Sequence, residues 1–344
     1  MSLDSNLAPE DWTSRIVTMM HDPASYPERP AHVTLRETHM AWVFLTDSYA
    51  YKLKKSVRTS YLDYSTYRNR RAACEAEIRL NSRLSPWVYL GMVPILHDGE
   101  GHLHLDAAEG APVEWIVKMR RLPDEALLDN AIAAGGLKAA ALDPAATLLA
   151  NFFRGQPRHP LVGDAFRESL ALDIDTDVEA VAAGTGRAQK EQAENLGQRL
   201  KNFLAAETAL MAERAERRVE GHGDLRPDHI YLGSPPAVID CIEFNRAFRF
   251  NDPVEELAFL KMACTRLNAG WVGDFFLDTY ARIANDAPPA RLVAFYAAKR
   301  AMLRAKLALW HIDDTTVDSA YWHKTASNYL DLAGSFMSEA ERAG

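Results

Sequence analysis

The spacing of apolar residues separates a strand-rich first part of the chain from a helix-rich remainder. Between residues 33 and 54, short runs of aromatic and β-branched residues alternate with polar ones and are joined by polar turns. This pattern predicts an antiparallel meander. Further strands are predicted at 93–96, 103–105 and 114–119. A single helix interrupts them, and we expect Ser65 to cap it and Pro86 to stop it after a run from Thr66 to Leu84.

Helical spacing dominates the chain after residue 123. Apolar residues recur every three or four positions, and the stretch from Arg187 to Arg217 reads as one long helix. A short helical segment and a proline-containing linker precede the first strand. The pattern therefore predicts an α+β protein in three parts, which are an N-terminal extension (1–30), a β-rich N-lobe (31–122) and a helical C-lobe (123–344).

Composition narrows the class of protein. The chain has 344 residues, of which 48% are hydrophobic and 25% charged, as is usual for a soluble globular protein. A net charge of −8 argues against a nucleic-acid-binding surface. Three widely spaced cysteines without a CxxC motif favour a reducing compartment and no zinc site. No signal-peptide pattern or membrane-spanning apolar run is present, so we expect a cytoplasmic protein.

Candidate chemistry gathers between Gly221 and Leu260. Asp224 follows His222-Gly223, and a short apolar strand at 237–239 leads directly to Asp240. Two carboxylates placed at the ends of strands suit metal-assisted phosphoryl transfer, because one can orient an attacking hydroxyl while the other holds a metal on the phosphates. The alternative is a β-hairpin with acidic turns, since short motifs also recur by chance.

This combination of motifs resembles the aminoglycoside phosphotransferase and choline kinase-like superfamily, which is similar to protein kinases. It is closest to a bacterial aminoglycoside-phosphotransferase-like family. The resemblance covers roughly residues 33–122 and 218–262 and implies a bilobal protein-kinase-like fold. It also implies that Asp224 is the catalytic base, that Asp240 is a metal ligand, and that Asp252 braces the catalytic loop.

Nucleotide-binding residues are expected in the N-lobe. Lys52 and Lys54 lie two apart on one strand and so share a face, and we favour Lys52 over Lys54 as the lysine that contacts the phosphates and Glu77. A solvated strand face is the alternative. By resemblance, Met119 and Leu122 line an adenine pocket at the hinge after residue 119. The turn at 37–41 contains no glycine, which weakens the case for a conventional phosphate cradle.

The metal site departs from the superfamily pattern at His229, where asparagine is usual. Imidazole suits manganese better than magnesium, which prefers oxygen ligands. His229 is therefore either a ligand or only a hydrogen-bonding residue within its loop. In the second case Asp240 holds the metal, with Glu243 as a further candidate ligand.

The sequence as a whole predicts an enzyme that uses ATP and Mg²⁺, or Mn²⁺, to phosphorylate a hydroxyl of a small molecule, without a nucleic-acid or membrane partner. Two alternatives stay open, a nucleotide-binding regulator without transfer activity and a Ser/Thr protein kinase. Arg300 and Arg304 share one face of a late helix. They are expected to form a solvated face, or else to meet an anionic substrate or a carboxylate.

Overall fold

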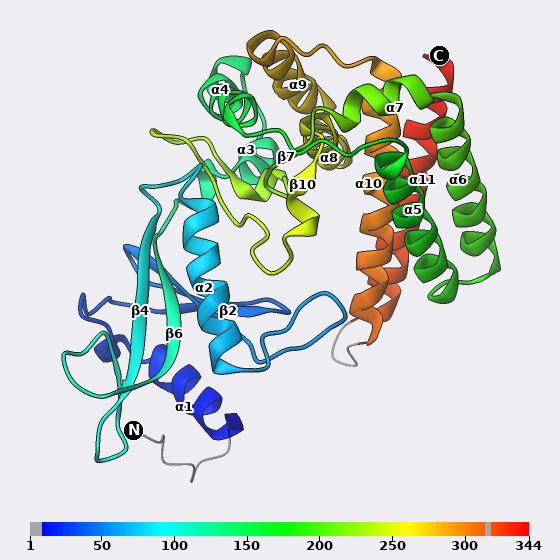
Figure 1. The fold of residues 1–344 in the computed structure, drawn as a ribbon. Helices are drawn as coiled ribbons and strands as arrows, with labels where there is room; N and C mark the ends of the chain where they lie inside the picture. Colours follow the sequence, from blue (N-terminus) through cyan, green and yellow to red (C-terminus); the bar gives the residue numbers. More distant parts are fainter. Residues whose placement is uncertain (1–8, 314–317, 344) are drawn as a thin grey trace. The chain divides into compact units, whose positions relative to one another are not determined.

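The structure is a computed structural model that describes residues 9–313 and 318–343 (Figure 1). It divides the chain into two compact units. Unit 1 contains the chain up to Asp124 together with Ala237–Arg246, and unit 2 contains Glu125–Pro236 and the residues from Ala247 onward. The sequence places Asp240 in the C-lobe, whereas here the segment that carries it belongs to the sheet-containing unit.

Unit 1 is built on one six-stranded antiparallel sheet with the strand order β1-β2-β3-β6-β4-β5. Its strands are β1 (Thr34–Glu37), β2 (Ala41–Leu45), β3 (Tyr49–Lys54), β4 (Tyr89–His97), β5 (Leu103–Leu105) and β6 (Ala111–Arg120). The predicted meander corresponds to β1, β2 and β3, and the turns between these strands are the predicted ones.

Alternation along β3 gives the sheet two different faces. Tyr51 and Leu53 join an apolar core that includes Ile16 and Met20 of helix α1 (Pro9–His21). The residues between them, Lys52 and Lys54, therefore point to the opposite face, because successive strand side chains alternate. Helix α2 (Tyr67–Asn81) contributes Glu77 to that face. The predicted cap of α2 is wrong by one residue, since the Thr66 hydroxyl accepts the hydrogen bond from the Asn69 N–H.

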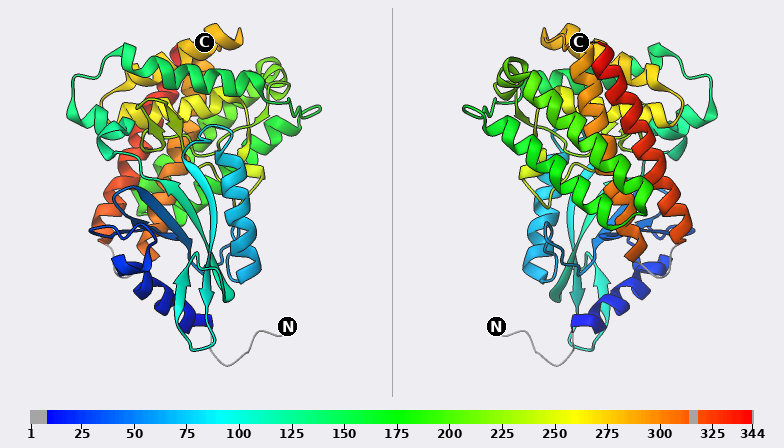
Figure 2. Two further views of the ribbon diagram at one scale, coloured as in Figure 1. Left: turned by 90° about the vertical axis from the view of Figure 1, so that its left-hand side faces the viewer. Right: turned by 90° about the vertical axis from the view of Figure 1, so that its right-hand side faces the viewer.

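Unit 2 is mainly helical, and α10 (orange) and α11 (red) run side by side along its length (Figure 2). Its helices are α3 (Leu128–Ala134), α4 (Ala139–Gly155), α5 (Ala165–Ala183), α6 (Arg187–Ala206), α7 (Thr208–Ala215), α8 (Pro253–Arg266), α9 (Gly270–Ala284), α10 (Ala290–Trp310) and α11 (Ser319–Arg342). Short strands β7 (Val219–Glu220) and β10 (Phe250–Asn251) pair with each other. The other two short strands are β8 (Ile230–Tyr231), in unit 2, and β9 (Ala237–Val238), in unit 1.

The long helix predicted from Arg187 to Arg217 is wrong. The chain breaks at Glu207, whose φ of −101° and ψ of 37° are not helical, so α6 and α7 are separate helices. Arg214, near the end of α7, is buried and forms ion pairs with Asp252 at 2.5 Å and Asp286 at 2.7 Å. Apolar spacing continued through the break and concealed it, because periodicity reports a buried face rather than an unbroken backbone.

All three cysteines, Cys74, Cys241 and Cys264, are buried free thiols. Burial raises the pKa of Cys74 and of Cys264 to about 12. None of the helices in the part of the chain that the structure describes is long and apolar enough to cross a bilayer.

Candidate functional site

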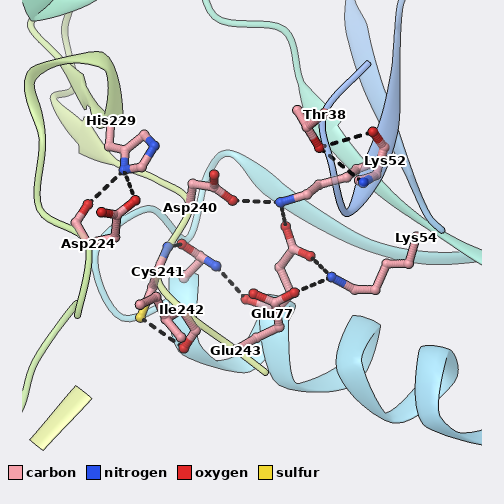
Figure 3. Close-up of polar contacts among 12 residues, drawn as sticks. Thr38, Lys52, Lys54, Glu77, Asp224, His229, Asp240, Cys241, Ile242 and Glu243 are labelled. Carbon is pink, nitrogen blue, oxygen red and sulfur yellow. Dashed lines mark hydrogen bonds and ion pairs between the residues drawn. The ribbon is translucent and has the colours of Figure 1, made fainter. Parts of the chain in front are cut away.

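A cluster of lysines and carboxylates lies on the α2 face of the sheet in unit 1 (Figure 3). We call Lys52, Lys54, Glu77, Asp240 and Glu243 the lysine cluster. The Lys52 ammonium donates to Glu77 Oε1 at 2.8 Å and to Asp240 Oδ1 at 2.6 Å. Burial disfavours this charge, but the Asp240 and Glu77 carboxylates outweigh burial and raise the pKa of Lys52 well above its usual value. Lys52 is therefore charged and held between two carboxylates.

Lys54 also reaches Glu77, donating to Oε2 at 2.6 Å. The expectation that only one lysine meets Glu77 is thus wrong, because the two carboxylate oxygens of Glu77 accept one lysine each. Lys54 further contacts Glu243, which also accepts from the Tyr64 hydroxyl. Burial tends to lower the pKa of Lys54, but the Glu243 and Glu77 carboxylates outweigh burial and raise this pKa well above its ordinary value.

These two lysines differ in exposure. The Lys52 side chain is 15% exposed, whereas that of Lys54 is 1% exposed. Glu77 is fully buried, whereas Glu75 on the same helix forms a surface pair with Arg71. Lys52 is therefore the lysine that an incoming anion can approach, and Lys54 is an internal counter-ion.

The backbone around Asp240 is held by side chains of the same unit. Asp240 N–H donates to the Tyr89 hydroxyl at 3.0 Å, and Cys241 N–H donates to Asn81 Oδ1 at 2.8 Å. Asp240 itself has a left-handed φ of 63°, which is uncommon for a residue that is not glycine. Its side chain is 45% exposed. A strained, exposed carboxylate two residues after β9 is typical of a functional position.

The second group of candidate residues lies in unit 2, in the segment His222–His229, which we call the Asp224 loop. Arg226 forms an ion pair with Asp224 Oδ2 at 3.1 Å and another with Asp228 at 3.0 Å. Burial tends to raise the pKa of Asp224, but the Arg226 guanidinium, followed by His229 and Arg304, lowers it below the usual range. Asp224 is therefore ionised at neutral pH and can accept a hydrogen bond from a hydroxyl.

Hydrogen bonds fix the imidazole of His229 within this loop. Nδ1 lies 2.9 Å from the Asp224 carbonyl oxygen, which can only accept, so Nδ1 carries the proton in the neutral ring. Nε2 is then the acceptor, and the Arg226 guanidinium lies 3.0 Å from it. A metal that bound at Nε2 would have to displace Arg226.

Glu256 of α8 braces the loop, and sequence reasoning missed it. Its carboxylate accepts hydrogen bonds from His222 N–H at 2.9 Å and Gly223 N–H at 3.0 Å. A Cβ on Gly221 would lie 2.1 Å from Glu256 Oε1, so only glycine fits there. The sequence did contain a signal for Glu256, because this acid follows Asp252, the N-cap of α8, by about one helical turn.

The prediction that Asp252 itself braces the Asp224 loop is wrong. Asp252 caps the N-terminus of α8 by accepting from Val254 N–H at 3.0 Å, and it accepts from Arg214 and from the Tyr296 hydroxyl. It fixes the start of the helix that carries Glu256. Its contribution to the Asp224 loop is therefore indirect.

The prediction that basic residues of α10 form a solvated face is also wrong in part. Lys299 and Arg300 are buried and pair with Glu255 at 3.1 Å and 3.0 Å. Arg300 thus meets a carboxylate, which was one of the options that the sequence left open. Within the described part of the chain, Arg304, one turn later, forms no such ion pair.

The expected adenine-pocket residues lie in unit 1 at the end of the sheet. Met119 is buried in β6 between Ala50 of β3 and Tyr89 of β4. Leu122 is partly exposed just after β6. Met119 therefore belongs to the sheet core, and only Leu122 offers surface at this position.

The candidate metal ligands differ in their chemistry. Asp240 offers carboxylate oxygen, the donor that Mg²⁺ prefers, on an exposed side chain. Glu243 is 8% exposed and already accepts from Lys54 and Tyr64, so it fits a metal less well. Within residues 9–313 and 318–343, no group of three or more His, Cys, Asp or Glu side chains is arranged to hold a metal ion. Asp240 is the residue that best fits a magnesium ligand.

Comparisons with known proteins agree on the fold. Relatives from Mycobacterium bovis and Mycobacterium tuberculosis, described as uncharacterized proteins, are 33% identical over 287 residues. The match covers 80% of this chain and 54% of theirs, so the chain spans about half the length of the curated relatives it matches. No family model matches the chain.

Solved structures extend the comparison to nearly the whole chain. The complex of APH(2")-IIia with GDP and kanamycin is 16% identical, with a TM-score of 0.56 over 94% of this chain and 98% of the other. A choline/ethanolamine kinase family protein from Mesorhizobium loti is also 16% identical, with a TM-score of 0.55 over 96% and 98%. A glucosamine kinase is 14% identical, with a TM-score of 0.51 over 91% and 80%.

These likenesses define the class of fold. The chain has the protein-kinase-like α+β fold of aminoglycoside phosphotransferases and choline kinases, with an antiparallel sheet in its first part and helices in its second. The predicted fold is confirmed.

Proposed function

We propose that this protein is an ATP-dependent phosphotransferase that moves the γ-phosphoryl group to a hydroxyl of a small molecule. The observation that carries the proposal is the position of Lys52, whose ammonium joins the buried Glu77 to the exposed Asp240. A lysine held in this way can exchange one carboxylate for the phosphates of a nucleotide. The exchanged carboxylate, Asp240, then becomes available to a cation.

Each residue of the site has a role in this proposal. Lys52 binds the α- and β-phosphates, Glu77 and Lys54 hold it in place, and Leu122 lies at the edge of the adenine site. Mg²⁺ would be held by Asp240 and would neutralise the charge that develops on the transferred phosphoryl group. Asp224 orients the acceptor hydroxyl and accepts its proton late in the transfer. The protein thus contributes mainly position and electrostatics.

The neighbours in fold support a small acceptor. Their names refer to kanamycin, to choline or ethanolamine, and to glucosamine. Only eleven positions separate Asp240 from Asp252, and they include the short strand β10, which leaves little chain for docking a peptide. A protein-kinase activity is less well supported for that reason. Because the reaction consumes ATP, the proposed compartment is the cytoplasm.

A nucleotide-binding regulator is the second candidate. The observation in its favour is the turn between β1 and β2, Thr38-His39-Met40, which has no glycine to let the backbone approach phosphate closely. In this case ATP would bind at Lys52 without being consumed.

A turnover screen separates these candidates. Wild type and Asp224→Asn are incubated with ATP and Mg²⁺, and then with hydroxyl-bearing metabolites, aminoglycosides or a Ser/Thr peptide library. We expect a small molecule to stimulate ATP consumption in the wild type alone. ATP binding without consumption in any arm would favour the regulator, and peptide phosphorylation would favour the protein kinase.

A further inference from the structure

Arg304 differs from the other basic residues of α10. Arg291 pairs with Glu207, Lys299 and Arg300 pair with Glu255, and Lys306 pairs with Asp177. Among the described residues, Arg304 has no carboxylate partner. Its guanidinium lies over the ring of Tyr329, 5.7 Å from the centroid. In the described chain, Arg304 is thus a partly buried arginine without an ion pair on a helix whose other basic residues are all ion-paired.

A second guanidinium lies at the same aromatic ring. Arg266, at the end of α8, is 5.5 Å from the centroid of Tyr329, which is buried in α11. Arg266 is exposed and, in the part of the chain that the structure describes, it also has no carboxylate partner. Three helices therefore bring two like charges to one ring. Like charges repel, so this arrangement favours a bound anion between or beside them.

Helices α8 and α10 connect Arg304 to the Asp224 loop within unit 2. Glu256 of α8 holds the loop, and the preceding residue, Glu255, holds Arg300 of α10. Arg304 lies one turn farther along α10, about 6 Å from Arg300 along the helix axis. The positive charge of Arg304 also contributes to the lowered pKa of Asp224. Arg304 is therefore within electrostatic reach of the carboxylate that would receive the acceptor hydroxyl.

We propose that Arg304 and Arg266 form an anion-binding subsite for the acceptor, which is therefore a small hydroxyl compound that carries a carboxylate or phosphate group. This inference rests on the proposed phosphotransferase function. The planar guanidinium matches both groups through paired N–H donors, and the cation–π contact with Tyr329 helps to position it. A polycationic acceptor would meet the like charges of Arg304 and Arg266 and would be repelled.

The first arm of the test measures turnover with hydroxyl-bearing acceptors that differ in charge. Glucose, gluconate, glucose 6-phosphate and kanamycin represent neutral, carboxylate, phosphate and cationic acceptors. We expect the wild type to consume ATP with an anionic acceptor and not with kanamycin. Arg304→Gln should raise the KM for that acceptor by about 10- to 100-fold, the loss expected for one charge-assisted hydrogen-bonded pair, with the KM for ATP unchanged.

Two further variants separate binding from folding. Arg304→Lys keeps the charge but loses the planar fork, so its KM should lie between those of wild type and Arg304→Gln. Arg282→Gln removes an exposed arginine of α9 and should behave as wild type. An equal rise of KM in Arg282→Gln, or preferred turnover of a neutral or cationic acceptor, would overturn the subsite while leaving the phosphotransferase standing.

The second arm needs no turnover. Inorganic phosphate and malonate are titrated into wild type, Arg304→Gln and Arg282→Gln, and thermal stabilisation is recorded. We expect Arg304→Gln alone to lose most of the stabilisation by one or both anions, which also shows whether phosphate or carboxylate is preferred. Equal stabilisation of all three proteins, or none in the wild type, contradicts the subsite. Loss in Arg304→Gln without ATP consumption by any acceptor would retain the subsite and reject the phosphotransferase.

Discussion

The lysine cluster of unit 1 and the Asp224 loop of unit 2 balance their charges differently. The lysine cluster sets two ammonium groups against three carboxylates, and both lysines are paired with acids. The Asp224 loop sets the carboxylates of Asp224 and Asp228 against the guanidinium of Arg226, and the charge of Arg304 also acts on Asp224. The first site is short of positive charge, whereas in the second two guanidinium groups match two carboxylates.

The two sites also differ in how they are held. The lysine cluster assembles residues from β3, α2 and the segment after β9, which are far apart in the sequence, through side-chain ion pairs. The Asp224 loop is a local turn whose backbone N–H groups are held by Glu256. The lysine cluster should therefore lose its arrangement when a charged side chain is removed. The Asp224 loop should lose its arrangement when the backbone shifts.

The largest effect is expected at Asp224. Asp224→Asn keeps the shape of the side chain but removes the charged acceptor for the hydroxyl proton. Transfer should fall by about 10²–10⁴-fold, the usual contribution of general acid–base catalysis. Nucleotide binding and thermal stability should stay near wild type, since Glu256 holds the loop independently. Steady-state kinetics and nucleotide titration test this, and full activity in Asp224→Asn would end the proposed mechanism.

The two lysines should separate ligand binding from stability. Lys52→Ala should weaken ATP binding and turnover far more than Lys54→Ala, because Lys52 is the more exposed of the two. Lys54→Ala should instead lower the free energy of unfolding by about 3–5 kcal/mol, because it removes the buried ammonium that pairs with the carboxylates of Glu77 and Glu243. Nucleotide titration and urea unfolding of both variants give the ranking. The reverse ranking would mean that Lys54 is the phosphate-binding lysine.

Glu256 should affect kcat rather than nucleotide affinity. Glu256→Ala leaves two buried N–H groups without an acceptor and lets the Asp224 loop move, so kcat should fall by up to about 100-fold, as for a displacement of about 1 Å. Glu256→Gln keeps one acceptor oxygen and should recover part of the loss. The KM for ATP should not change. Equal losses in the Ala and Gln variants would show that the negative charge, rather than the hydrogen bonds, is what matters.

The smallest effect is expected at His229. If His229 is a metal ligand, manganese should support activity at least as well as magnesium, and His229→Asn should shift the preference toward magnesium by a few-fold. If His229 only forms hydrogen bonds within the loop, the magnesium and manganese titrations of His229→Asn should superimpose on those of the wild type. Because His229 Nε2 accepts a hydrogen bond from Arg226, a metal at Nε2 would compete with Arg226 for the same lone pair.

Much of the fold could be predicted from the sequence. Strand alternation in β1, β2 and β3, and the motifs at Asp224 and Asp240, are local patterns, whereas the insertion of β6 between β3 and β4 is not one. The pairing of Lys52 with Glu77 was expected by resemblance. These features lie in short segments whose side chains obey a simple period.

The remaining features depend on long-range partners that no period encodes. Lys54 shares the face of Lys52, but its burial required Glu243 from nearly two hundred residues later. The bracing role was assigned to Asp252 and belongs to Glu256, because both acids lie within the start of α8 and only the three-dimensional position of the Asp224 loop distinguishes them. The break at Glu207 was hidden for a similar reason, since both flanking helices bury the same kind of face.

The buried cysteines make the protein ready for site-directed spectroscopy. With Cys74 and Cys264 protonated well above neutral pH, the native thiols should react slowly with maleimides, since the thiolate is the nucleophile. A cysteine introduced at the exposed Glu100 of unit 1 and another at the exposed Arg187 of unit 2 could then carry a donor and acceptor dye. Energy transfer between the dyes would report directly how nucleotide and acceptor alter the separation of the two units.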